Sequence, residues 1–224
     1  MESKLLLNNK GPRPIEIVPI LYGADGLILQ IPTITVERNS FTTVDLRDWA
    51  DTGGEVFRKG NIRLYHRGKD LVIGAQITVV DENHSLVFEN KLTELGKFDS
   101  TRFEAVWWVP NNDTESTVAL TNTSDEILTV TAILTRKPNI LGEPKSVYLQ
   151  PHQTKVLNVR QDFDQGNAFA NSKVLGLTLF HSSPSKDALI AWTLVKDESK
   201  GYSNVANFYN PAKAKSNRLD GAGL

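Results

Sequence analysis

The 224-residue chain contains no cysteine, which excludes disulfide bonds, thiol catalysis and cysteine-ligated zinc but leaves the redox compartment open. It also has no run of about 18 apolar residues, the length that a membrane-spanning helix requires. The first residues, Met1 to Lys4, show neither the charged nor the apolar region of a signal peptide. We therefore expect no membrane insertion.

An excess of charge of either sign is also missing. Lys and Arg number 25 and Asp and Glu number 26, which gives a formal net charge of -1. A broad basic surface is what binds nucleic acid, so we expect no nucleic-acid partner. Nothing in the chain matches a P-loop, a G-x-G-x-x-G fingerprint, H-E-x-x-H or an EF-hand, and we therefore expect no cofactor, no metal and no enzymatic activity.

What the chain does contain is an internal repeat. Residues 3–47 match residues 116–160 at a constant shift of 113 positions, with apolar and polar residues in step. Further along, His66 recurs as His181 and Arg102 recurs as Arg218, in the same order and at similar spacing. Self-similarity of this kind predicts a duplicated unit. We assign the first unit to residues 1–105 and the second to residues 106–224, with 106–115 as a connecting strand or linker.

The phase of the repeat suggests how the chain relates to its source. Glu2 coincides with Glu115, and the segment that begins at Arg218 stops where the matching segment at Arg102 runs on. We hypothesise a piece of a longer exported protein. The alternative is a complete two-repeat protein of the cytosol.

Within each unit, short apolar stretches alternate with Gly, Pro, Asn and Asp, which is typical of strands and turns. Alternate residues from Leu128 to Leu134 are apolar, whereas Thr129 and Thr131 between them are polar, so one face of this strand should be buried. The predicted strands are 4–8, 15–22, 27–36, 42–46, 61–66, 71–80 and 85–90, then 117–121, 127–136, 146–150, 154–159, 175–181, 188–196 and 202–209. Short helices are predicted at 45–56 and 161–171. The pattern predicts an all-β protein of two tandem antiparallel β-sandwich domains.

Three stretches carry a resemblance to a known group. They are Leu120-Thr121-Asn122-Thr123-Ser124, Leu128-Thr129-Val130-Thr131 and Leu149-Gln150-Pro151-His152-Gln153-Thr154-Lys155-Val156-Leu157. Together they resemble the repeats of bacterial exported immunoglobulin-like proteins, a broad group that includes pilus-chaperone-like sandwiches. The first unit departs from the pattern at Asn8 to Gly11 and at Arg38. The resemblance implies an immunoglobulin-like fold and a periplasmic, cell-surface or secreted setting, with the signal peptide absent from this chain, and the cytoplasm is the alternative. It implies no chemistry.

Histidines and acidic pairs recur in both units. His66 and His181 each end a predicted strand, and without a G-x-S-x-G elbow they favour a structural role over a catalytic triad. Asp81-Glu82 and Asp197-Glu198 contain the groups of a glycosidase or a calcium site. Neighbouring residues on a strand point in opposite directions, however, so these pairs are interpreted as hairpin turns. Pro211 to Arg218 form a short basic stretch that we interpret as a solvated loop.

The candidate ligand-binding residues are Trp107, Trp108, Asn111 and Asn112, between the two units. Exposed tryptophans on a sheet can stack on sugar rings. The competing interpretation is core packing, because one of two adjacent tryptophans on a strand must face inward. Trp49 and Trp192 are likewise assigned to a helix and a buried strand.

Two equivalent units, with no residue set that is present in just one of them, favour a non-catalytic structural, adhesion or protein-interaction module. Its partners would be other proteins or further copies, held through sheet edges. A carbohydrate-binding module of a secreted polysaccharide-handling system is the alternative, and a hydrolase of unknown type is the second alternative.

Overall fold

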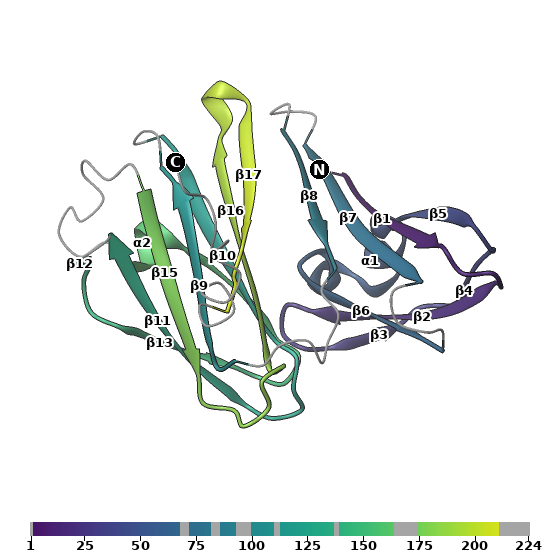
Figure 1. The fold of residues 1–224 in the computed structure, drawn as a ribbon, viewed down its shortest axis with the longest axis horizontal. Helices are drawn as coiled ribbons and strands as arrows, with labels where there is room; N and C mark the ends of the chain where they lie inside the picture. The colour runs from purple at the N-terminus through teal and green to yellow at the C-terminus, as the bar shows by residue number, and fades with distance from the viewer. Residues whose placement is uncertain are drawn as a thin grey trace, which may run out of the picture.

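The computed structural model describes residues 2–67, 72–81, 86–92, 100–109, 113–136, 139–163 and 174–210. Of the described residues, 61% lie in strands and 11% in helices, and these strands form four antiparallel sheets. The predicted all-β class is therefore confirmed. Figure 1 shows two halves side by side, which we call the first half (2–92) and the second half (100–210).

The first half consists of two sheets. Sheet A has the strand order β5-β1-β7-β8, and in sheet B β2 pairs with β3, β4 and β6. The strands of sheet A are β5 (Ser40–Asp45), β1 (Glu2–Asn9), β7 (Ile73–Asp81) and β8 (Leu86–Lys91). Those of sheet B are β3 (Ile28–Gln30), β2 (Ile15–Gly23), β4 (Ile34–Val36) and β6 (Gly60–His66). A short α-helix, α1 (Leu46–Gly53), and a 3₁₀ turn, η1 (Glu55–Arg58), follow β5.

The second half repeats this plan with one strand more. Sheet D has the order β14-β10-β16-β17, and sheet C has the order β12-β11-β15-β9, with β13 also paired to β11. The strands of sheet D are β14 (Thr154–Asn158), β10 (Glu115–Asn122), β16 (Leu189–Asp197) and β17 (Tyr202–Asn207). Those of sheet C are β12 (Asn139–Ile140), β11 (Leu128–Arg136), β15 (Val174–His181), β9 (Arg102–Trp108) and β13 (Lys145–Leu149). The helical segments are α2 (Val159–Phe163) and the 3₁₀ turn η3 (Glu198–Lys200).

Most predicted strands lie on observed ones, with ends that differ by no more than two residues. The predicted strand 27–36 is instead two strands, β3 and β4, because Pro32 between them has no N–H to donate to a ladder. The predicted helix at 45–56 divides into α1 and η1. Its counterpart α2 begins at Val159, and residues 164–171 of that prediction lie outside the described residues.

The predicted boundary between the units, at residues 105 and 106, falls inside β9. Phe103 pairs with Leu179 and Trp107 pairs with Leu175, so the whole strand belongs to sheet C. β9, which the sequence prediction divided between the two units, is therefore an edge strand of sheet C in the second half.

Each half has its own hydrophobic core between its two sheets. In the first half Leu5 and Leu7 of sheet A meet Ile15 and Ile17 of sheet B. In the second half the cluster includes residues of sheets C and D, and the alternate residues of β11 predicted to face inward are at most 1% exposed. Two separate clusters mean that each half can bury apolar surface by itself.

The two halves correspond in detail at the shift of 113. β1 and β10 begin at Glu2 and Glu115, and β2 and β11 begin at Ile15 and Leu128. The two non-glycine residues with positive φ in the described chain are Asn39 (50°) and His152 (59°), which is the same shift again. At these positions the strand starts and the positive-φ turns of the two halves have the same spacing.

Candidate functional site

A buried asparagine binds backbone groups at the end of β1 in the first half and at the end of β10 in the second half. The Nδ2 of Asn9 donates to the carbonyl oxygens of Arg13 and Val36 at 2.8 and 3.0 Å. Its Oδ1 accepts from the N–H of Gly11 at 2.8 Å. The side chain is fully buried and bonds to three backbone groups, so it links the strand end, the following turn and a strand of the other sheet.

Asn122 makes the corresponding contacts in the second half. Its Nδ2 donates to the carbonyl oxygens of Glu126, Leu149 and Gln150 at 2.7, 3.3 and 2.9 Å, and its Oδ1 accepts from the N–H of Ser124 at 2.9 Å. Three of these four partners lie 113 positions after the partners of Asn9. Asn9 and Asn122 therefore have the same structural role, each in its own half.

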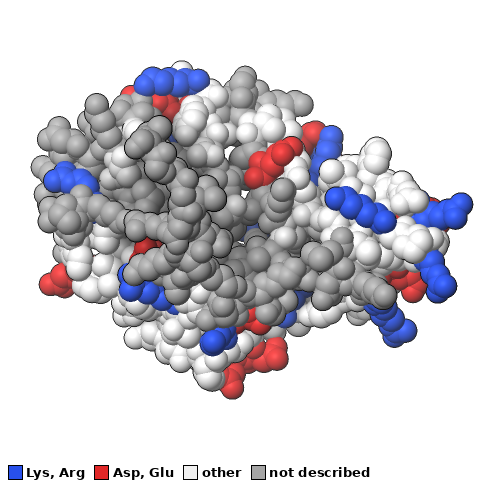
Figure 2. Space-filling view, viewed as in Figure 1, with Lys and Arg blue, Asp and Glu red and all other residues white. Residues whose placement is uncertain are grey.

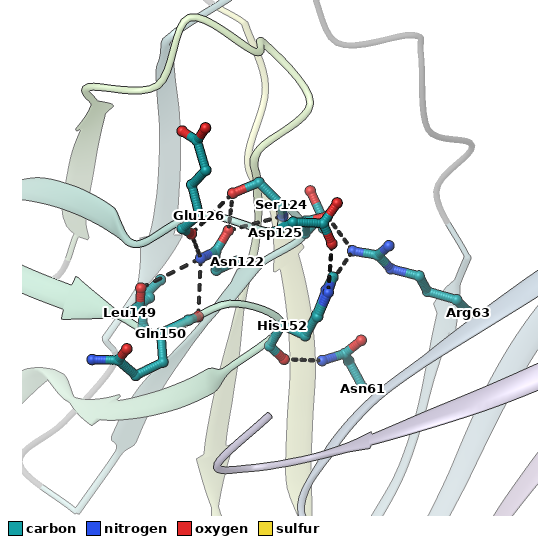
Figure 3. A network of polar contacts seen from close by, with 10 residues as sticks. Asn61, Arg63, Asn122, Ser124, Asp125, Glu126, Leu149, Gln150 and His152 are labelled. Carbon is teal, nitrogen blue, oxygen red and sulfur yellow. Dashed lines mark hydrogen bonds and ion pairs between the residues drawn. The ribbon is translucent and has the colours of Figure 1, made fainter. Parts of the chain in front are cut away.

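The two halves meet at a polar junction, which Figure 3 shows from close by. We define the junction as Asn61 and Arg63 of β6 against Thr123, Asp125 and His152 of two turns in the second half. The Nδ2 of Asn61 donates to the carbonyl oxygen of His152 at 3.0 Å. The guanidinium of Arg63 donates to the carbonyl oxygen of Thr123. These bonds fix strand β6 of the first half to turns of the second half.

His152 is the centre of the junction. Its Nδ1 lies 3.2 Å from Nη2 of Arg63, and its Nε2 lies 2.9 Å from Oδ1 of Asp125. Because a guanidinium can only donate, Nδ1 must accept, and the proton of the neutral ring sits on Nε2, where it faces the carboxylate. The side chain is 12% exposed whereas that of Asp125 is 95% exposed. The ring therefore connects a partly buried cation to an anion at the surface.

Packing reinforces these polar contacts. The ring of Tyr22 lies 4.5 Å from the ring of His152, and the guanidinium of Arg63 lies 5.1 Å from the centre of the Tyr22 ring. Burial raises the pKa of the Tyr22 phenol, and the charge of Arg63 opposes that rise. At Gly26, where φ is +93°, a Cβ would lie 2.5 Å from the carbonyl oxygen of Pro151. The close approach requires glycine at this position.

The junction does not have the arrangement of a hydrolytic site. A histidine that acts as a base for a nucleophile needs one nitrogen directed at a hydroxyl, but in His152 that nitrogen faces Arg63. The nearby hydroxyl of Ser124 donates instead to Oδ1 of Asn122 at 2.7 Å. Among the described residues there is also no group of three or more His, Cys, Asp or Glu side chains that could hold a metal ion. The arrangement is suited to holding two domains together.

The two histidines singled out by the repeat are placed differently from one another. His181 ends β15, is 7% exposed and stacks on Phe103 with ring centres 5.9 Å apart. Its ring nitrogens have no partner in hydrogen-bond geometry, and burial lowers the pKa of the imidazole, an effect that the nearby backbone of Ser100 opposes. His66 ends β6 and is partly exposed. Neither histidine joins a cluster of catalytic groups in the described structure.

The acidic pair at the end of β16 forms part of a hairpin. Asp197 is 1% exposed and accepts from the hydroxyl of Ser199 at 2.6 Å, whereas Glu198 pairs with Lys196 at 2.5 Å on the surface. The two carboxylates thus have separate partners. In the first half Asp81 ends β7, and Glu82 lies outside the described residues.

The adjacent tryptophans of β9 face opposite sides of sheet C. Trp107 is 2% exposed and its Nε1 donates to the hydroxyl of Ser116 at 3.0 Å, so it belongs to the core. Trp108 is 67% exposed and lies opposite Val174, which leaves its ring accessible to a ligand. Asn111 and Asn112 lie outside the described residues. Of the four candidate ligand-binding residues, the structure places Trp108 alone on the described surface.

Sequence reasoning missed the junction. Asn61 and Arg63 stand in a strand with no motif around them, and Thr123 contributes a backbone oxygen that has no signature in the sequence. His152 aligns with Asn39, and both Asn and His are among the residues enriched at positive φ. The alignment therefore indicates a shared turn and carries no signal of the contacts that His152 makes.

The surface of the described part carries both signs of charge. On the face drawn in Figure 2, acidic and basic side chains lie near one another around the molecule. In the described residues no helix is both long and apolar enough to cross a membrane. No family model, curated protein or solved structure matches this chain.

Proposed function

We propose that this chain is a non-catalytic structural, adhesion or protein-interaction module of an exported or surface bacterial protein. In this proposal the halves are tandem immunoglobulin-like sandwiches that arose by duplication. The separate cores, the equivalent fastenings of Asn9 and Asn122 and the shared turn at Asn39 and His152 support a common origin.

The observation that carries the functional proposal is the junction. Tyr22, Arg63 and His152 form an aromatic, cation–π and hydrogen-bonded contact between the halves, which restrains how one half is oriented on the other. A fixed orientation is useful to a module that spaces or displays binding surfaces, because it avoids the entropy cost of ordering two loose domains on binding.

Two measurements test this proposal. Small-angle scattering of the full chain should give one compact distance distribution, and Arg63→Ala should broaden it. Screening against broad panels of glycoside, ester and peptide substrates should find no turnover, and turnover that disappears in His66→Ala or Asp81→Asn would contradict the non-catalytic assignment. Fractionation of the source cells with an antibody should place the protein outside the cytoplasm.

A carbohydrate-binding module is the second candidate, and Trp108 is the observation that favours it. Its ring is exposed on the outer face of sheet C, and Val106, two residues earlier on the same face, is 46% exposed. An aromatic ring beside a small apolar surface can stack on a sugar. A glycan array on which binding is lost in Trp108→Ala, with the fold intact by circular dichroism, would establish this function.

A further inference from the structure

Besides the junction, the two halves have a second contact, which lies between two terminal strands. β8 is the last strand of sheet A, and β17 is the last strand of sheet D. Figure 1 shows the two strands facing one another, and they lie close together in space. The hydroxyl of Ser203 on β17 donates to the carbonyl oxygen of Val87 on β8 at 3.1 Å. We call this the β8–β17 contact.

Equivalent positions of the two halves meet in the β8–β17 contact. β7 and β16 begin and end 116 residues apart, and so do β8 and β17. Ser203 lies 116 positions after Val87, and the residues opposite them on the neighbouring strands, Lys196 and Val80, keep the same spacing. The hydrogen bond therefore joins a residue of one half to its own counterpart in the other half.

A contact between equivalent residues has the geometry of a two-fold interface. In a two-fold dimer both subunits use the same patch of surface, so a residue near the axis meets its own counterpart. The cleft beside the hydrogen bond follows the same rule. It is lined by Glu89 and Val205, which are again 116 positions apart, together with Val87, Ser203 and Asn204. At these strands the two halves thus meet as two identical subunits would.

The β8–β17 contact is small. The carbonyl oxygen of Val87 accepts from Ser203 and so points away from β7, and by alternation the carbonyl oxygen of Glu89 points the same way. Among the described residues no backbone-to-backbone hydrogen bond joins β8 to β17. The side chain of Val87 also stays 55% exposed. Separating the two strands therefore disrupts little, and it exposes the edges of both.

We infer that the β8–β17 contact is reversible and that a second copy of this chain is the partner that replaces one half in it. In the resulting dimer β8 of each copy would contact β17 of the other, and the junction would form between the copies in the same way. The exchange is possible at low cost because both arrangements contain the same contacts. The inference rests on the proposed function as a protein-interaction module, for which it names the partner.

Protein concentration decides between the closed monomer and the exchanged dimer. Because the two halves belong to one chain, each experiences the other at an effective concentration in the millimolar range. The chain should therefore be monomeric at about 1 μM, and dimers should appear as the concentration approaches about 1 mM.

The first test shows whether β8 and β17 meet in solution. The full chain has no cysteine, so introduced cysteines are its only thiols. A short thiol-specific cross-linker should join Val87→Cys to Ser203→Cys within one chain at about 1 μM protein. The matched control joins Val87→Cys with Ile140→Cys, because Ile140 is 63% exposed but lies on β12, at the far end of sheet C. The control should give no product within one chain.

The second test detects exchange between copies. Chains with Val87→Cys and a mass tag are mixed at about 1 mM with untagged chains that carry Ser203→Cys, and are then cross-linked. Peptide mass spectrometry should find the two introduced cysteines joined between a tagged and an untagged chain. Either variant alone should give far less dimer, because exchange places each cysteine against the opposite strand and not against its own copy.

A charge-matched pair of variants shows that the dimer uses the β8–β17 contact. Val87→Lys with Ser203→Lys places like charges against each other in both arrangements, so this chain should sediment as a monomer even at about 1 mM. Val87→Lys with Ser203→Glu restores the attraction and should dimerise as the unaltered chain does. Circular dichroism should give the same spectrum for both variants.

Three results would overturn the inference. They are a cross-link within one chain that is no stronger than in the Ile140→Cys control, no product between copies at about 1 mM, and equal dimerisation of the two charge variants. Any of these leaves the non-catalytic assignment standing, because that assignment is decided by the turnover assays.

Discussion

The first and second halves share a backbone plan but differ in how completely their cores are enclosed. In the second half β9 covers the edge of sheet C, and residues such as Leu177 and Leu179 are at most 1% exposed. In the first half the corresponding Ile62 and Leu64 keep part of their surface in contact with solvent. The comparison teaches that the burial of Leu177 and Leu179 depends on the edge strand β9 that pairs with β15.

The largest effect should follow the removal of the indole that β9 places in the core of the second half. Trp107→Ala deletes a 2% exposed side chain and its bond to Ser116, and should lower the free energy of unfolding of the second half by about 3 to 5 kcal/mol. Trp108→Ala, at an exposed position on the same strand, should cost less than about 0.5 kcal/mol. Urea denaturation followed by circular dichroism measures both values. Equal losses would show that β9 does not close this core.

The two buried asparagines give a pair of variants that should act equally, each in its own half. Asn122→Leu and Asn9→Leu leave several buried carbonyl groups unpaired, and each should cost about 2 to 3 kcal/mol. Hydrogen exchange by mass spectrometry would show which half opens. Destabilisation of both halves by either variant would mean that the cores are not independent.

Asn39 and His152 occupy equivalent positive-φ turns, but of these two residues His152 alone is part of the junction. Asn39→Gly relieves backbone strain without touching the junction, and should be neutral or stabilising by up to about 1 kcal/mol. His152→Gly relieves similar strain but removes the ring between Arg63 and Asp125, so we expect a net loss of about 1 to 2 kcal/mol. Scattering should show a broader distribution of shapes for the second variant alone. A compact His152→Gly protein would argue that the ring does not hold the halves together.

The smallest effect concerns pH and the second half. Burial lowers the pKa of His181 in the folded state, whereas in the unfolded chain the imidazole titrates near its ordinary value of about 6.5. Below that value the unfolded state binds more protons than the folded state. The free energy of unfolding is therefore greatest above a pH of about 6.5 and falls as the pH decreases. Between pH 7.5 and 5.5 the second half should lose stability, and His181→Leu should flatten the dependence. An unchanged slope in that variant would assign the effect to other groups.

The sequence was sufficient to locate most strands, because alternation along β11 and β10 reports directly which side chains face a core. It did not predict β9, because 102–105 was assigned to no strand and 106–115 was interpreted as a connecting strand or linker. Alternation also does not show which neighbour a strand joins, so the pairing of β9 with β15 was not predicted either. It also did not show the junction, where bonds from Arg63 and Asn61 end on backbone oxygens that any residue could supply. The position of Trp107 in the core was one of two interpretations that the sequence left open.

The place of β9 in the chain has a consequence for synthesis. β9 leaves the ribosome directly after the first half, long before its eventual neighbour β15 has been made. During that interval Phe103, Ala105 and Trp107 of β9 have no neighbouring strand to cover them. We therefore expect the core of the second half to form only after residue 181, the end of β15, has been synthesised.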